Sequence, residues 1–250
     1  VSVTVFHLLN ANGSLTVDDY SLEEIGASPK FTEGMVSFSF DDGFENTYTN
    51  GIPILDKAGI KSTQAIITSG FNDPEYMTKD QVKILAANGH EISAHTRTHP
   101  DLVTLTQAQA MDEISGSKAD LAALGITATS FMYPFDSYSD SVVSLVKNAG
   151  FLGARDSDIG YNTPLSNPYL IESQNVNNDV SIDTIKGWID KAISEKLWVV
   201  LVFHRQVKLP NTPENLYCND PAILQQIVDY VKLKNVKTVT VGQGVSMLGK

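Results

Sequence analysis

The sequence has little that would indicate a disulfide-linked, membrane-spanning or nucleotide-binding protein. Its single cysteine, Cys218, excludes an internal disulfide, and because no histidine lies near it in the sequence we expect a packed thiol. No apolar stretch reaches the roughly 18 residues that span a bilayer, and the run at 197–203 has the length of a buried strand. Neither of the glycine-rich phosphate-binding motifs occurs, so nothing favours a nucleotide-binding fold.

Basic residues are also scarce. The chain of 250 residues has 18 lysines and arginines against 29 aspartates and glutamates, which gives a formal net charge of −11. A chain of this charge repels phosphate backbones, so we do not expect nucleic acid as a partner. Neutral glycans remain compatible with it, and the acidity also favours solubility.

Residues 1–30 differ in pattern from the rest. Valines alternate with polar residues at 1–5, Ala-Asn-Gly-Ser follows at 11–14, and apolar residues alternate again up to Tyr20, which predicts a β-hairpin. Two strands alone are marginally stable. We therefore expect 1–30 to be a hairpin and linker left from a preceding β-sandwich module, and 31–250 to be the main domain of a longer, secreted protein whose signal peptide is not visible here.

The main domain alternates strand-like and helix-like segments, which predicts a parallel sheet. The expected strands are Met35–Phe40, Ser62–Thr68, His90–Ala94, Ala128–Tyr133, Phe151–Ala154, Leu197–Phe203 and Val236–Val241. The expected helices lie near 46–58, 78–88, 106–124, 139–149, 181–195 and 220–234, and several end at a glycine suited to a left-handed cap, at positions 59, 89, 125 and 150. This α/β pattern is compatible with a barrel or an open doubly wound sheet.

Polar residues follow four of the predicted strands, at the ends where parallel α/β folds place their ligand sites. Asp41-Asp42-Gly43 follows the first strand, His95 the third, Pro134-Phe135-Asp136 the fourth and His204 the strand at 197–203. Successive strand residues point to opposite faces, so one aspartate of the pair can bind a metal while the other serves as a base. A surface turn is the alternative interpretation of Asp-Asp-Gly.

His95 and His99 are four residues apart, within reach of a single ion, and Pro100 favours a bent turn at His99 over a continuing helix. Together with one carboxylate they make a three-ligand site that leaves positions for water and substrate. The spare aspartate would be the general base, and His204 would give a proton to the leaving alcohol or amine. His90 begins a strand, and we expect it to be structural.

These segments, taken in order, resemble the motifs of a known enzyme family. Phe-Asp-Asp-Gly at 40–43, His-Thr-Arg-Thr-His-Pro at 95–100, Tyr-Pro-Phe at 133–135 and Val-Phe-His at 202–204 are similar to those of the NodB-homology polysaccharide deacetylases, carbohydrate esterase family four. The resemblance runs from about Met35 to Leu248. It implies a distorted (β/α)7-type barrel.

The resemblance also implies roles for individual residues. Asp42, His95 and His99 would bind the metal, and Asp41 would be the general base. His204 would be the general acid, and the backbone N–H of Phe135 would stabilise the oxyanion. The residues that would contact the substrate are Tyr133, Pro134, Val202 and Asp158.

Two departures from the family pattern concern the support of the catalytic groups. Met132 occupies the position of an arginine that in the family braces the catalytic aspartate, and Arg155 is the candidate to replace it. The fourth motif of the family usually carries an aspartate and a tryptophan, whereas residues 155–159 offer acids but no tryptophan. The aspartate that would orient His204 is either Asp156 or Asp158, and either could instead be only a loop acid.

The function expected from the resemblance is removal of acetyl groups from a polysaccharide, with release of acetate. The substrate would be O-acetyl xylan or an N-acetylglucosamine polymer, and the cofactor a divalent metal, zinc first and cobalt or nickel as alternatives. We expect a monomer. A catalytically impaired carbohydrate-binding relative is the competing hypothesis, motivated by Met132.

Overall fold

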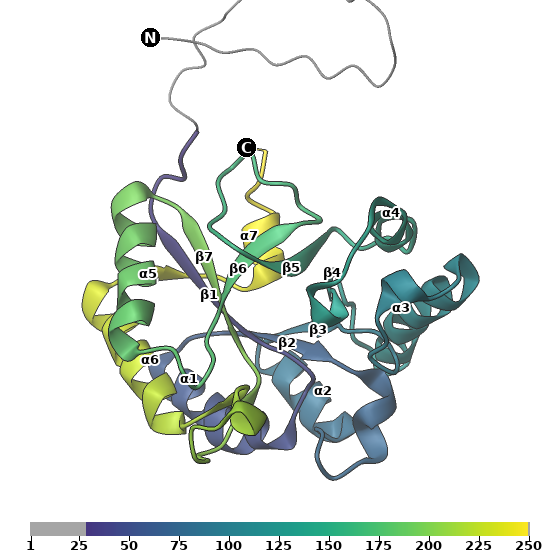
Figure 1. The fold of residues 1–250 in the computed structure, drawn as a ribbon, viewed down its shortest axis with the longest axis horizontal. Helices are drawn as coiled ribbons and strands as arrows, with labels where there is room; N and C mark the ends of the chain where they lie inside the picture. The colour runs from purple at the N-terminus through teal and green to yellow at the C-terminus, as the bar shows by residue number, and fades with distance from the viewer. Residues whose placement is uncertain (1–28, 250) are drawn as a thin grey trace, which may run out of the picture.

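The computed structural model describes residues 29–249, so the hairpin predicted near the start of the chain lies outside the described residues. Seven parallel strands form a closed barrel with helices around it (Figure 1), which confirms the predicted (β/α)7-type fold. The strands follow one another in sequence order, and the first also pairs with the seventh over Met35–Phe40 and Trp198–Phe203. This last pairing closes the sheet.

The barrel strands are β1 (Met35–Phe40), β2 (Thr63–Ile66), β3 (Glu91–Ala94), β4 (Ser130–Met132), β5 (Gly153–Ile159), β6 (Ile171–Asn175) and β7 (Trp198–Phe203). The helices are α1 (Ile52–Ala58), α2 (Lys79–Ala87), α3 (Gln107–Ala122), α4 (Asp140–Asn148), α5 (Ile182–Glu195), α6 (Pro221–Lys234) and α7 (Val241–Val245). Shorter turns are η1 (Thr47–Gly51, π-helical), η2 (Thr68–Asn72), η3 (Leu102–Thr104), η4 (Pro134–Asp136) and η5 (Pro213–Asn215). The remaining strands are β8 (Arg205–Gln206), β9 (Cys218–Asn219) and β10 (Lys237–Thr238).

Two strand predictions were wrong in detail. Strand β6 was not predicted, because its sequence Ile-Glu-Ser-Gln-Asn lacks the apolar run expected of a buried strand. Within the strand predicted at Val236–Val241, only β10 forms, and it pairs with β1 outside the closed ring. Val241 already belongs to α7. The predicted seven strands therefore included one segment that does not belong to the barrel and omitted one that does.

The helix boundaries follow from local capping. Thr78 and Thr106 begin α2 and α3 with reciprocal side-chain and backbone hydrogen bonds to the glutamines three residues later. The four predicted cap glycines all have positive φ, from 73° to 89°, as a left-handed helix end requires. These caps confirm the predicted helix ends near 59, 89, 125 and 150.

Strict alternation along the strands sorts side chains into two apolar layers. In β7, Trp198, Val200 and Val202 join a cluster inside the barrel with Met132, while the intervening residues pack under the helices. The same alternation continues past the strand ends. Asp41 and His204 are in phase with the inward residues of β1 and β7, so the sequence aims both at the barrel axis.

Candidate active site

Three metal-ligating groups converge at the carboxyl end of the barrel. His95 Nε2 and His99 Nε2 are 3.1 Å apart, and each lies 3.5 Å from Asp42 Oδ1. Ligands about 2.0–2.1 Å from a tetrahedral zinc ion lie about 3.3 Å from one another. The triangle therefore has the dimensions of a zinc site with its fourth position open. Among residues 29–249, these three side chains form the group whose ligand atoms lie close enough together to hold a metal ion.

The buried His95 is oriented by the strand next to it. Its Nδ1 lies 2.9 Å from the carbonyl oxygen of Met132, which accepts a hydrogen bond when Nδ1 carries the proton. Nε2 is then left for the ligand triangle, as is usual for metal-binding histidines. Burial and the nearby charge of His95 lower the pKa of His99 to about 4. Burial also lowers the pKa of His95, but the hydrogen bond with Asp42 and the charges of Asp41 and Asp42 raise it overall. Binding of a metal requires both imidazoles to be neutral.

Asp42 is ionised in this setting. Burial raises the pKa of Asp42, but the hydrogen bond with His95 and the charges of the surrounding histidines outweigh it and lower the pKa to about 2. Asp42 has φ +71°, a left-handed conformation that is uncommon outside glycine, and Gly43 follows with φ +77°. The predicted tight turn after β1 thus carries the carboxylate over the rim of the barrel.

Asp41 lies inside the barrel and is paired with Arg155. Arg155 Nη2 donates to Asp41 Oδ2 at 2.5 Å, and both side chains are buried. The arginine is itself held, because Nε contacts the sulfur of Met132 at 3.3 Å and Nη1 donates to the carbonyl of Asp156. Burial raises the pKa of Asp41, yet the charges of Arg155 and of His95 and His204 lower it overall.

The other oxygen of Asp41 differs from the first. Oδ1 is buried and has no hydrogen-bond partner among the described residues. A buried acceptor without a partner is rare in folded proteins and marks a place where a bound water or substrate belongs. Asp41 therefore has one oxygen fixed by Arg155 and one without a partner in the described chain.

A pocket of about 310 Å³ brings most of the predicted site residues together. Its lining consists of Asp41, Asp42, His95, His99, Tyr133, Phe135, Asp136, Asn175, Asn177, His204 and Tyr217. The Phe135 ring is 64% exposed and stands edge-on to His99, with ring centroids 4.5 Å apart. The His204 ring lies 4.8 Å from the ring of Tyr217 on the other strand-end loop. At the mouth of the pocket, the exposed side chains of Phe135 and Tyr217 thus contact His99 and His204, respectively.

Other predicted site residues lie outside this pocket. Val202 is buried in the apolar cluster inside the barrel, and Pro134 is buried at the start of η4. Asp158 is exposed and accepts a hydrogen bond from the Tyr138 hydroxyl at 2.9 Å, while Asp156 accepts one from the backbone of Asp158. Within the described chain, neither Asp156 nor Asp158 forms a hydrogen bond with His204.

The pocket also contains residues that the sequence did not indicate. Asn175 and Asn177 come from the end of β6 and the loop after it, and Tyr217 from the segment before β9. The Oδ1 atom of Asn177 is buried without a partner in the described structure. Recognition of Ile171–Asn175 as a strand would have placed Asn175 in phase with Ile171 and hence toward the barrel axis.

An acid, two histidines and a buried Asp–Arg pair at the mouth of a (β/α) barrel are the groups that a metal-assisted hydrolase uses. The chain belongs to the polysaccharide deacetylase family, since the model of that family matches residues 28–154, just over half of the chain. None of the helices between residues 29 and 249 is long and apolar enough to cross a membrane.

Curated relatives match part of their length. The YxkH protein of Bacillus subtilis (strain 168), assigned to the polysaccharide deacetylases, is 30% identical over 146 residues, 57% of this chain and 52% of that protein. The poly-beta-1,6-N-acetyl-D-glucosamine N-deacetylase of Staphylococcus aureus (strain MSSA476) is 26% identical over 174 residues, 64% of this chain and 60% of that enzyme. The chain thus spans about half the length of the curated relatives it matches.

Solved structures share the fold over most of the chain. The Xyl-CE4 domain of a multidomain xylanase from the hindgut metagenome of Trinervitermes trinervoides has a TM-score of 0.59 at 18% identity, covering 84% of this chain and 89% of that one. The Bc1960 peptidoglycan N-acetylglucosamine deacetylase has a TM-score of 0.62 at 20% identity, covering 88% and 91%. BA3943, a pseudoenzyme from Bacillus anthracis, has a TM-score of 0.60 at 15% identity, covering 86% and 66%.

Proposed function

We propose that the protein removes acetyl groups from a polysaccharide by metal-assisted hydrolysis, outside the cell, and that the substrate is O-acetyl xylan or an N-acetylglucosamine polymer. The observation that carries this proposal is the meeting of two groups in one pocket. The Asp42–His95–His99 triangle has the dimensions of a metal site, and Asp41 beside it keeps one unpartnered oxygen. The similarity to a poly-beta-1,6-N-acetyl-D-glucosamine N-deacetylase and the fold shared with the Xyl-CE4 domain of a xylanase support the substrate class.

The metal would be held by Asp42 Oδ1, His95 Nε2 and His99 Nε2, with zinc first and cobalt or nickel as alternatives. Once bound, it would polarise the acetyl carbonyl and acidify a water molecule. Asp42 would contribute one negative charge and the two imidazoles would bind as neutral donors. A divalent ion held by these three ligands would therefore keep a net positive charge to act on the substrate.

Asp41 would take the proton from the attacking water through Oδ1. Arg155 holds Oδ2 and favours the ionised carboxylate, which a base must be in order to act. In this proposal Arg155 is a positioning residue, and its guanidinium enters from β5, the strand next to Met132 on β4. An arginine on either of two adjacent strands can reach the same point inside a narrow barrel.

His204 would give a proton to the leaving oxygen or nitrogen of the sugar. It faces the pocket from the end of β7, and Thr47 donates to its backbone oxygen at 2.8 Å, which ties the segment to η1. The N–H of Phe135 would bind the developing oxyanion together with the metal. Tyr133, Asn175, Asn177 and Tyr217 line the remaining wall and are the groups placed to contact the sugar.

One observation favours a second candidate, a catalytically impaired carbohydrate-binding relative. Met132 stands in place of the family arginine, and the fold is shared with a pseudoenzyme. Against it, Arg155 makes the contact with Asp41 that a base requires, and the pocket retains both aspartates and all three histidines.

Acetate release from acetylated xylan and from chitin oligomers decides between the two candidates. The protein should be loaded with zinc, and the assay repeated after removal of the metal by a chelator and after its return. We expect acetate from at least one substrate, loss of release with the chelator and recovery with zinc. No release from either substrate by the loaded protein, or release that the chelator leaves unchanged, would contradict the proposed reaction.

A further inference from the structure

The loop that carries both histidine ligands has a strained backbone. Thr96 has φ +63° and His99 has φ +59°, both in the left-handed region that favours glycine. For a β-branched residue such as threonine this conformation is an outlier. Residues held this way persist when the surrounding structure imposes them. The convergence of the two imidazoles therefore requires support from outside the loop.

Contacts within the loop are few. The Thr96 hydroxyl donates to the carbonyl of His95 at 2.6 Å and accepts from the N–H of His99 at 2.9 Å. The η2 turn adds two backbone bonds, from Thr68 N to Thr96 O and from Ser69 N to Arg97 O. These bonds shape the loop but leave the N–H groups of Arg97 and Thr98 without a partner from the loop or η2.

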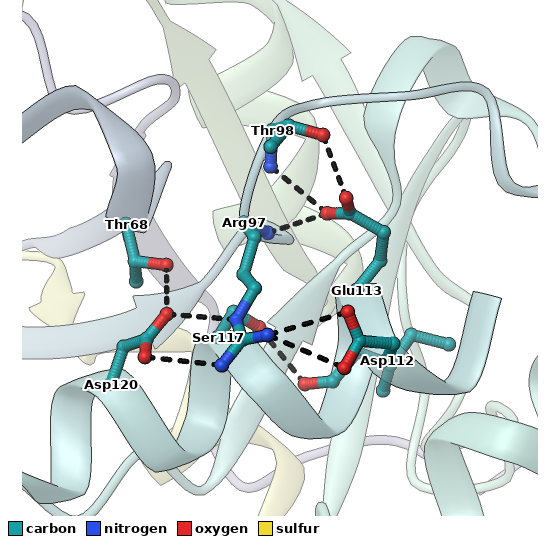
Figure 2. A network of polar contacts seen from close by, with 8 residues as sticks. Thr68, Arg97, Thr98, Asp112, Glu113, Ser117 and Asp120 are labelled. Carbon is teal, nitrogen blue, oxygen red and sulfur yellow. Dashed lines mark hydrogen bonds and ion pairs between the residues drawn. The ribbon is translucent and has the colours of Figure 1, made fainter. Parts of the chain in front are cut away.

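Glu113 of α3 supplies that partner (Figure 2). Its Oε2 accepts from the backbone N–H of Arg97 at 2.8 Å and of Thr98 at 2.9 Å. Its Oε1 accepts from the Thr98 hydroxyl at 2.7 Å. One carboxylate thus holds two consecutive backbone N–H groups midway between the histidine ligands, and hydrogen bonds to a charged acceptor are about twice as strong as neutral ones.

The Arg97 side chain lies against α3 near Asp120, about two helical turns beyond Glu113. Asp120 accepts from Nε at 3.0 Å and from Nη2 at 3.3 Å, and it also accepts from the Thr68 hydroxyl at 2.8 Å (Figure 2). Asp120 therefore joins the histidine loop to the η2 turn.

Gly116 makes this position of Arg97 possible. A Cβ added there would lie 2.3 Å from Nε and 2.4 Å from Cζ of the guanidinium. Glycine inside a helix is destabilising relative to alanine, and the close approach of Arg97 is a reason for its presence. Gly187, inside α5, offers a contrast, because a Cβ there meets nothing within 4 Å.

We propose that α3 sets the metal-binding geometry, with Glu113, Gly116 and Asp120 acting as positioning residues for His95 and His99. The inference rests on the proposed function, because it assumes that these histidines bind the metal. Neither Glu113 nor Asp120 touches the ligand atoms. Glu113 fixes the backbone N–H groups of Arg97 and Thr98, and Asp120 fixes the Arg97 side chain. Both contacts hold the segment between the two ligands against a helix packed on the barrel.

The test is the affinity of the full chain for zinc, measured by competition with a chelating dye. We expect Glu113→Ala to weaken zinc binding by about 10- to 100-fold, the usual effect of removing support for metal ligands. Gly116→Ala displaces only the flexible end of the Arg97 side chain, so it should weaken zinc binding by a smaller factor that still exceeds twofold. Gly187→Ala and Glu195→Ala are matched controls, one an alanine in another helix and the other the loss of an exposed carboxylate, and both should bind zinc as the parent does.

Thermal unfolding with and without zinc separates positioning from general stability. A purely structural role would lower the unfolding temperature of both forms equally, whereas weaker binding shrinks the increment that zinc adds. If Glu113→Ala does not fold, Glu113→Gln, which keeps its volume and one acceptor oxygen, is judged by the same criterion. Folded variants that bind zinc within twofold of the parent overturn this inference alone. A parent that binds no zinc overturns the proposed function itself.

Discussion

The two ends of the barrel differ in backbone strain and in how completely their buried polar side chains are hydrogen-bonded. At the carboxyl end, backbone strain gathers on the residues around the pocket. Non-glycine residues with positive φ there are Asp42, Thr96, His99, Phe135 and Asp136, while the other two in the described chain, Lys196 and Asn235, end helices. The buried Oδ1 of Asp41 is unpartnered there as well.

At the amino end, Glu91 shows the opposite arrangement. Its Oε2 accepts from the Thr63 hydroxyl and from the N–H of Gly242, each at 2.8 Å, and its Oε1 accepts from the Ser130 hydroxyl at 2.6 Å. This one carboxylate joins the starts of β2, β3 and β4 to α7. Every acceptor atom of the side chain is used.

The contrast indicates a division of work along the barrel axis. The Glu91 carboxylate at the amino end is fully paired and holds the fold, whereas residues around the pocket at the carboxyl end are strained or, at Asp41 Oδ1, unpartnered. Substitutions at the two ends should therefore separate activity from stability.

The largest effect is expected at the unpaired carboxylate. Asp41→Asn should lower kcat/KM by about 10²–10⁴-fold, because it removes the proposed general base. Its metal content should stay at that of the parent, whereas His95→Ala should lose the metal. Metal analysis together with acetate-release kinetics on both variants checks this, and the reverse pattern of metal content would overturn the assigned roles.

Breaking the buried pair should come next. Arg155→Met should lower the free energy of unfolding by about 3–5 kcal/mol, because it leaves the Asp41 charge buried without its partner. Adding Asp41→Asn to that variant should recover part of the loss, since no charge then remains to be compensated. Urea unfolding of the two single variants and the double variant measures the coupling. Strictly additive losses would mean that the pair is not coupled.

At the satisfied end, stability should change without chemistry. Glu91→Ala should lower the free energy of unfolding by about 1–3 kcal/mol, because the Gly242 N–H and two hydroxyls lose their acceptor. The value of kcat per folded molecule should equal that of the parent. A fall in kcat comparable to that of Asp41→Asn would remove the proposed separation of the two ends.

The smallest effect is expected in the pH dependence of stability. Burial, with the charge of Asp158, raises the pKa of Asp156 to about 7, far above its value in the unfolded chain. Asp156 therefore favours folding while protonated, and this contribution is lost as pH rises through 7. The parent should lose about 1 kcal/mol of unfolding free energy between pH 6 and 8 through this group, and Asp156→Asn should lose correspondingly less. Equal slopes for the two proteins would refute the shift.

Much of the fold could be predicted because helix caps and apolar strands leave local signals. The capping glycines and the strands at 35–40 and 197–203 depend on residues close in sequence, and the structure has them where they were expected. Strand β6 could not be read this way, because Glu172, Ser173 and Gln174 carry no strand pattern, and it is pairing with β5 and β7 that makes this segment a strand.

The candidate site divides in the same manner. Asp42, His95 and His99 follow predicted strands, and the barrel brings them together. Asn177 and Tyr217 reach the pocket from loops whose paths depend on tertiary packing, so no local pattern marks them. The support from α3 was not visible either, since Glu113 lies 15 residues beyond Thr98 and meets it through the packing of a whole helix.

Anomalous scattering from zinc-soaked crystals would show whether the proposed metal site binds zinc. Data collected on either side of the zinc absorption edge locate the ion without reference to activity. We predict a single strong peak at the carboxyl end of the barrel, about 2.0–2.2 Å from Asp42 Oδ1, His95 Nε2 and His99 Nε2. If crystals fully exposed to zinc showed no peak within bonding distance of these three atoms, Asp42, His95 and His99 would not be a zinc site.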